Sequence, residues 1–222
     1  MNMWFDLLGE TTFVLKRDKI NILIIEEKNA YYKIGMELYN AYNRNPSTIV
    51  FSSENKPIDA SSHIELLNQF IPVDICSKKL LAKINTMLNS IIQSDYYEEF
   101  FELSGKMQSF LSNVVFASDL PLTFDTIQSE QLLKSANIRI DIANENLCEL
   151  IIDYCKTVRM IMGERLFVFY GLLNFISCDE LQQIEHSLLR NELYVLFVDN
   201  HIEEKRSECE EIIIIDKDLC VI

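Results

Sequence analysis

Residues 20–35 read INILIIEEKNAYYKIG, an apolar run that continues directly into a segment with helical spacing. The run at 21–26 is rich in isoleucine and has the length of a buried strand. Beyond it, apolar and aromatic residues recur at steps of three and four, which predicts a helix over 28–43. The next apolar run, TIVFS at 48–52, predicts a second strand. The order strand, helix, strand is typical of α/β proteins.

The junction between the first strand and the helix is EEKN, at 26–29. A phosphate-binding junction needs glycines there, so that backbone N–H groups can close on the anion. Two carboxylates at that position would repel a triphosphate, and Lys33 is either a lone cation or a solvated lysine of the helix. The later run at 165–171 ends in Tyr170 and Gly171, where an acidic residue that holds magnesium would be expected. The sequence therefore predicts no bound nucleotide, in a fold like that of a nucleotide hydrolase without its catalytic parts.

The strand pattern returns in the last third of the chain. A helix over 179–190, with Ser177 as its N-cap, is expected between two apolar runs. Continuous apolar runs that flank helices indicate parallel strands covered on both faces. The other predicted strands are FDLL at 5–8, TTFVL at 11–15, RLFVFYG at 165–171, LYVLFVD at 193–199 and EIIIID at 211–216.

The middle of the chain is helical in pattern. Residues 77–117 carry apolar side chains at helical spacing, and one unbroken helix would be a rod of about 60 Å at ~1.5 Å per residue. We expect a kink at 94–95 or 104–105. A second helix over 144–162 has a similar stripe, and the two stripes can cover each other or the same helices of another subunit. The predicted domains are a discontinuous α/β head, 1–76 with 163–222, and an inserted helical leg, 77–162.

The composition is strongly acidic. Twenty Lys and Arg stand against 34 Asp and Glu, a formal net charge of −14, which argues against a general binder of polyanions. The cysteines form no C-x-x-C pair, so neither a zinc site nor a disulfide framework is indicated. No run approaches the ~18 apolar residues of a membrane span, and the start of the chain lacks a signal-peptide pattern. We therefore expect a cytoplasmic protein without membrane contact.

Two kinds of charged cluster are candidates for binding. Basic residues gather at 16–19 and 28–33 and again at Lys78, Lys79 and Lys83, either as ordinary solvated charge or as a patch that symmetry multiplies into a ring. The segment SDLPLTFDTIQSEQ, at 118–131, offers carboxylates of the kind that calcium binds, although a solvated loop has the same composition.

Several segments, in this order and spacing, resemble a known family. They are MNMWFDLLGE at 1–10, ILIIEE at 22–27, NAYYKIGMELYNAY at 29–42, the stretch at 166–199, and EIIIIDKDLC at 211–220. Together they resemble the short form of Csn2, the CRISPR-associated adaptation proteins of type II-A systems. The likeness covers nearly the whole chain and contains no catalytic signature.

The resemblance implies a RecA-like α/β head that lacks Walker motifs, with an inserted long-helix leg. It implies a non-enzymatic homotetrameric ring that binds calcium and threads onto double-stranded DNA ends during spacer acquisition, an antiviral defence. Other adaptation proteins, the integrase complex and the effector nuclease, are the implied partners. The DNA-binding residues, chosen by clustering, are Lys16, Arg17, Lys19, Lys28 and Lys33. The calcium ligands are Asp119, Asp125 and Glu130; relatives are more acidic in this segment, where the present chain has Pro121, Thr123 and Thr126.

Two alternatives belong to other functional classes. One is a degenerate NTPase or nuclease of α/β fold, which would show turnover dependent on a particular carboxylate. The other is an acidic protein-interaction scaffold that does not bind DNA. Salt-dependent retention on linear duplex argues against the scaffold, because counterion release is the mark of phosphate contact.

Overall fold

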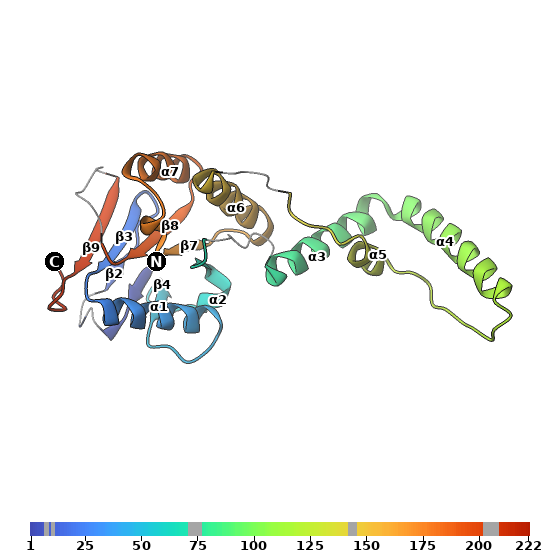
Figure 1. The fold of residues 1–222 in the computed structure, drawn as a ribbon, viewed down its shortest axis with the longest axis horizontal. Helices are drawn as coiled ribbons and strands as arrows, with labels where there is room; N and C mark the ends of the chain where they lie inside the picture. The colour runs from blue at the N-terminus through green and yellow to red at the C-terminus, as the bar shows by residue number, and fades with distance from the viewer. Residues whose placement is uncertain (7–8, 10–11, 71–76, 142–145, 202–208) are drawn as a thin grey trace. The chain divides into compact units, whose positions relative to one another are not determined.

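The computed structural model describes residues 1–6, 9, 12–70, 77–141, 146–201 and 209–222. The chain divides into two compact units. Residues 1–74 and 142–222 form the α/β unit, and residues 75–141 form the helical unit (Figure 1). No helix within the described ranges is long and apolar enough to cross a membrane.

A parallel sheet forms the centre of the α/β unit. Its strand order is β6-β7-β8-β3-β9, and every neighbouring pair is parallel. All residues of β3 and β8, two of the three inner strands, are buried, since helices cover both faces of the sheet, and such strands read as continuous apolar runs. The predicted α/β class is confirmed. The strands are β3 (Ile20–Ile25), β6 (Ile64–Leu67), β7 (Leu166–Tyr170), β8 (Tyr194–Asp199) and β9 (Glu210–Ile215).

Helices lie on both faces of this sheet. Helix α1 (Lys28–Tyr42) and the short α2 (Ala60–His63) lie on one side, while α6 (Leu147–Met162) and α7 (Cys178–Arg190) lie on the other (Figure 1). Helix α7 begins as predicted, because Ser177 and Glu180 form a reciprocal capping box. A short 3-10 turn, η2 (Leu172–Asn174), follows β7.

A small antiparallel sheet completes the α/β unit. Its order is β2-β1-β4-β5, and buried side chains such as Met3, Phe13 and Phe51 join the same apolar core as β3 and α1. The predicted strand at 5–8 is wrong for Phe5 and Asp6, which lie outside any strand, and residues 7–8 lie outside the described part of the chain. The strands are β1 (Asn2–Trp4), β2 (Phe13–Val14), β4 (Val50–Ser53) and β5 (Lys56–Pro57).

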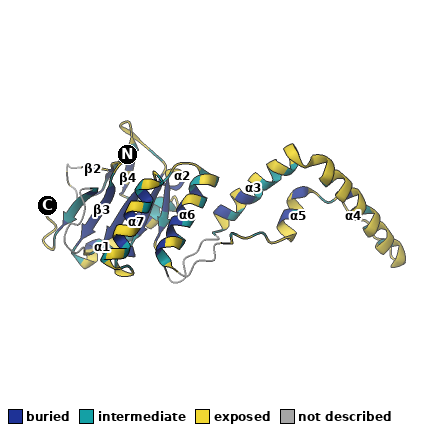
Figure 2. Ribbon diagram, turned by 90° about the horizontal axis from the view of Figure 1, so that it is seen from above, coloured by how far each residue is buried: buried dark blue, intermediate teal, exposed yellow. Residues whose placement is uncertain are grey.

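The helical unit contains α3 (Lys78–Asp95), α4 (Tyr97–Ala117) and α5 (Ser129–Ser135). The predicted rod breaks at Tyr96, whose φ of −124° and ψ of 21° are not helical, so the kink expected at 94–95 is confirmed within a residue. Helix α5 packs on α3, where the Ser129 hydroxyl donates to Oδ1 of Asn89. Figure 2 shows that α4 is exposed along nearly its whole length.

The structure divides the chain differently from the predicted domains. Helix α6, assigned to the leg from its apolar stripe, belongs to the α/β unit. Its side chains Ile151, Cys155 and Val158 are fully buried, and the helix contacts α7. Helical periodicity indicates that one face is covered and does not reveal what covers it. The boundary therefore falls between residues 141 and 142, where the prediction has 162 and 163.

A close approach fixes α1 against the end of β7. The rings of Tyr31 and Tyr170 stack with centroids 4.5 Å apart and an interplanar angle of 9°. Tyr170 also lies directly over Gly35, where a Cβ atom would meet its Cζ at 2.4 Å. Only glycine leaves room for this ring in the middle of a helix.

We predict that Gly35→Ala lowers the unfolding free energy of the α/β unit by about 1–3 kcal/mol, because the added methyl group must displace the Tyr170 ring. Denaturant unfolding followed by the fluorescence of Trp4, the single tryptophan, reports on this unit. Gly105→Ala is the matched control, since a Cβ there meets nothing within 4 Å in α4 of the other unit. Equal stability of Gly35→Ala and the parent would contradict this account of the packing.

Candidate functional site

The turn between β3 and α1 is closed by its own carboxylate. The two oxygens of Glu27 accept hydrogen bonds from the backbone N–H groups of Asn29, at 3.0 Å, and Ala30, at 2.7 Å. These backbone donors lower the pKa of Glu27, so it is charged at neutral pH. A bound phosphate would need the same N–H groups at the start of the helix.

An aromatic side chain covers the same turn. The Tyr170 hydroxyl donates to the backbone carbonyl of Tyr31 at 2.8 Å, across the first turn of α1. Burial raises the pKa of Tyr170 to about 12. Gly171, at φ +81°, lets the chain turn away immediately after this ring. The prediction that the turn holds no nucleotide gains geometric support, because the chain's own carboxylate uses the backbone donors.

The acidic residue missing from β7 stands on the neighbouring strand. Asp199, at the end of β8, is 1% exposed. Its carboxylate accepts from the backbone N–H groups of Leu173 and Asn200 and from the Asn174 amide, all within 2.9 Å. Burial raises the pKa of Asp199, and these donors partly oppose that shift. Both oxygens thus hold the turn after β7, which gives Asp199 a structural role.

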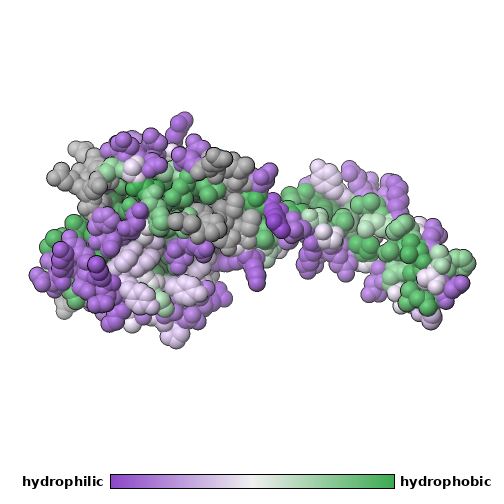
Figure 3. All heavy atoms as spheres, viewed as in Figure 1, coloured by the Kyte–Doolittle hydropathy of each residue, from purple (hydrophilic) through white to green (hydrophobic). Residues whose placement is uncertain are grey.

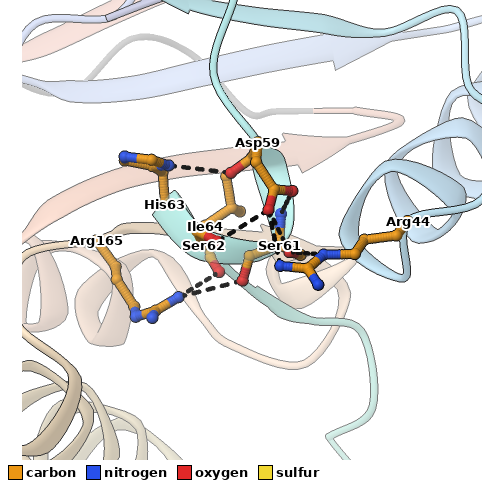
Figure 4. A network of polar contacts seen from close by, with 7 residues as sticks. All are labelled: Arg44, Asp59, Ser61, Ser62, His63, Ile64 and Arg165. Atoms are coloured by element: carbon orange, nitrogen blue, oxygen red, sulfur yellow. Dashed lines mark hydrogen bonds and ion pairs between the residues drawn. The ribbon is translucent and has the colours of Figure 1, made fainter.

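A serine, a histidine and an aspartate lie close together at α2, but they do not form a catalytic set. The Ser61 hydroxyl donates to Asp59 at 2.9 Å and accepts from Nε of Arg44 at 2.7 Å. His63 instead contacts the backbone carbonyl of Asp59 at 3.0 Å (Figure 4). A nucleophile needs a base within hydrogen-bond reach, and here the Ser61 hydroxyl is held by Asp59, the N-cap of the helix.

The first predicted DNA-binding cluster lies at the amino edge of the parallel sheet, in the turn before β3. Lys16 forms an ion pair of 2.9 Å with Glu211. Arg17 pairs with Glu164, and its guanidinium lies 5.4 Å from the centre of the Tyr194 ring. Both ion pairs are substantially exposed to solvent. Lys19 is half-buried beside them in the same turn.

The second predicted cluster lies elsewhere. Lys28 and Lys33 are exposed on the first turns of α1, which begins at the carboxyl edge of the sheet. The six residues of β3 separate the clusters by about 20 Å at ~3.3 Å per residue. Lys33 also lines a cavity of about 300 Å³ together with the carboxylates Glu27 and Glu37. Within one chain the five predicted residues therefore form no continuous patch.

The predicted calcium ligands are spread over three settings. Asp119 has φ +53° just after α4, Asp125 lies in an extended exposed segment, and Glu130 is in the first turn of α5. Within the described ranges, no three His, Cys, Asp or Glu side chains are grouped so that they could hold a metal ion. The arrangement of these three carboxylates in a single chain does not fit a calcium site.

The helical unit presents an apolar surface that sequence reasoning identified only as a stripe. Phe101, Phe110 and Phe116 on α4 are 68%, 66% and 86% exposed, and in α4 only Ser104 is buried. Figure 3 shows this apolar surface along the helical unit. Surfaces of this kind mark interaction sites in proteins that function in water. The alternative basic residues Lys78, Lys79 and Lys83 are exposed on the first turns of α3.

Comparison with known proteins gives a consistent result. The family model described as CRISPR-associated protein (Cas_Csn2) matches residues 41–219. The chain is similar to the CRISPR-associated protein Csn2 of Enterococcus faecalis, with 18% identity over 208 residues that cover 93% of each chain. It shares its fold with Stu0660 of Streptococcus thermophilus, with a TM-score of 0.61 and 13% identity. That alignment covers 97% of this chain and 75% of that chain.

We predict that calorimetric titration with ATP, with or without magnesium, gives no heat of binding. The backbone donors at the turn are occupied by Glu27, whose charged carboxylate would also repel a triphosphate. A dissociation constant in the micromolar range would contradict this closed geometry.

Proposed function

Because the chain belongs to the CRISPR-associated Csn2 family, we propose that it is a non-enzymatic, ring-forming protein that binds double-stranded DNA ends during spacer acquisition. The observation that carries the proposal is the exposed apolar face of α4. A ring is the simplest way for so acidic a chain to enclose DNA, and a ring needs a surface between subunits.

The sheet topology favours a RecA-like head. The chain passes from β3 to the far strand β6, returns through β7 and β8, and then crosses to β9 on the other side of β3. Ligands of open α/β sheets bind outside the carboxyl ends of the strands, at the point where the order reverses. In this chain that point is closed by Glu27 and Tyr170, which is consistent with a head that has lost nucleotide binding.

The oligomer is expected to be a homotetramer, as the family resemblance implies. Each fully covered Phe, Leu or Val side chain stabilises an interface by about 1.5–3 kcal/mol relative to exposure. Helix α4 offers several such side chains, and the acidic Glu98 and Glu99 in its first turn stabilise its amino end. Association of like surfaces under rotational symmetry would bury this face in every subunit.

The ring also accounts for the charge. A cluster that is weak in one subunit becomes a positive belt when it is repeated around an axis. The carboxylate partners of Lys16 and Arg17 are exposed, and exposed ion pairs contribute only about 0–1 kcal/mol. Replacing the carboxylates of Glu211 and Glu164 by DNA phosphates therefore costs little free energy. Lys28 and Lys33 would add to the same belt only if a neighbouring subunit brings the two edges together.

Two other functions are less well supported. An NTPase or nuclease would need the phosphate donors that Glu27 occupies, or the metal-binding group that the described residues do not form. A scaffold that never touches DNA remains the main competitor. We propose calcium binding from the family resemblance alone. The ligands of such a site would come from more than one subunit.

We predict that linear duplex shifts in a gel while closed-circular duplex of the same sequence does not, because a ring that threads onto DNA needs an end. The experiment is run with and without calcium. The double variant Lys16→Glu, Lys19→Glu should bind linear duplex more weakly. The slope of log binding constant against log salt concentration should fall by about 1 for each lost phosphate contact. Equal binding of linear and circular DNA would contradict threading, and no binding of either would favour the scaffold.

We predict that light scattering at micromolar concentration gives a mass several times that of one chain. Phe110→Ser with Val114→Ser should shift the protein toward the monomer, because these exposed side chains lie one turn apart on the same face of α4. Met160→Ser is the matched control, an apolar side chain that is 82% exposed in the α/β unit. A monomeric parent, or an unchanged mass of the double variant, would show that α4 does not hold the oligomer.

A further inference from the structure

A small cationic cavity lies at the amino ends of β7 and β8, inside the α/β unit. It measures about 150 Å³, and its lining includes Arg17, His63, Arg159 and Arg165 together with the carboxylates Glu164 and Glu192. We propose that this cavity is a binding site for a terminal phosphate monoester, which in a DNA-binding ring is the 5′ phosphate of a duplex end. This inference rests on the proposed function for the source of the phosphate, and on the cavity for the chemistry.

Two of the arginines are held in place by backbone carbonyl groups. Arg159, in the last turn of α6, donates to the carbonyls of Asn191 at 2.5 Å and Glu192 at 3.4 Å. Arg165 donates through Nη1 to the carbonyls of Ser61 at 3.4 Å and Ile64 at 3.3 Å. Both guanidinium groups are thus fixed before a ligand arrives, which reduces the entropy lost on binding.

The guanidinium group of Arg165 is only partly hydrogen-bonded among the described residues. Nε of Arg165 is buried and has no hydrogen-bond partner among the described residues. Because this nitrogen has almost no solvent-accessible surface, it does not face the cavity, and a ligand there would use other donors of the lining. Figure 4 places Arg165 and His63 on the same side of α2, with Arg44 on the other, which agrees with the lining of the cavity.

Size and charge select a phosphate group. At ~30 Å³ for each water, 150 Å³ holds about five waters, which suits a phosphate and is below the ~300 Å³ of pockets for larger ligands. A phosphate monoester carries close to two negative charges at pH 7, while an internal phosphodiester carries one. Three guanidinium groups therefore favour a chain end over the interior of the backbone.

The chain's own Glu164 stands in for the anion. Its carboxylate pairs with Arg17 and lies 3.8 Å from Nη2 of Arg159. These two arginines lower the pKa of Glu164, so it is charged at neutral pH. The side chain is 59% exposed and follows Gly163, so it can turn out into solvent when a phosphate replaces it.

The test compares duplexes that carry either a 5′ phosphate or a 5′ hydroxyl group. We expect the phosphorylated end to bind about tenfold more tightly, the effect of one strong charge-assisted contact. Arg17→Gln should remove this preference, and Glu164→Gln, which deletes the competing carboxylate, should increase it several-fold. Both positions are exposed, and unchanged melting temperatures will verify that the variants fold.

Inorganic phosphate separates the possible sources of the ligand. If the proposal is right, millimolar inorganic phosphate abolishes the preference of the parent protein for phosphorylated ends. A chloride salt without sulfate, at equal ionic strength, leaves that preference unchanged. Equal binding of both duplexes overturns the proposal and leaves the proposed function intact, because the hydroxyl duplex still binds. Thermal stabilisation by phosphate without any preference between the duplexes would identify a site for free phosphate and overturn the assignment to DNA ends.

Discussion

The packing of Tyr170 over Gly35 is the contact on which the arrangement of the α/β unit depends. It brings the end of β7 onto the first turns of α1 and stacks Tyr170 on Tyr31. Glu27 then satisfies the N–H groups that open at the start of the helix. A region that binds ligands in many α/β proteins has become part of the packed structure.

A group of three arginines lies at the opposite, amino edge of the sheet. Arg17, Arg159 and Arg165 meet there around a small cavity, and exposed carboxylates balance them. Such ion pairs are weak in water and can be exchanged for phosphate oxygens at little cost. An acidic chain can in this way hold DNA with a few placed cations while its net charge stays negative.

The sequence was most informative where one pattern has one structural meaning. The apolar run at 20–25 and the helical steps after it gave β3 and α1, and Ser177 marked the start of α7. Local signals of this kind depend only on neighbouring residues. The break at Tyr96 lies within a residue of one of the two kinks expected, and α4 continues unbroken through the other, at 104–105.

Long-range features could not be obtained this way. The apolar stripe of α6 is compatible with packing in a helical leg or on a sheet. Only the fold shows that α6 belongs to the α/β unit and that its stripe is buried there. Lys19 and Lys28 are close in sequence, yet a buried strand places them at opposite edges. Arg159 and Arg165 gave no signal as single residues, because their meeting with Arg17 depends on three separate segments of the fold.

The central claim is that the amino edge, and not the β3–α1 turn, receives DNA. Amide hydrogen exchange with and without saturating linear duplex tests this most directly. The account predicts slower exchange in peptides that cover 16–19 and 159–165, with no change at 26–31. Protection confined to 26–31, with the amino edge unaffected, would contradict it.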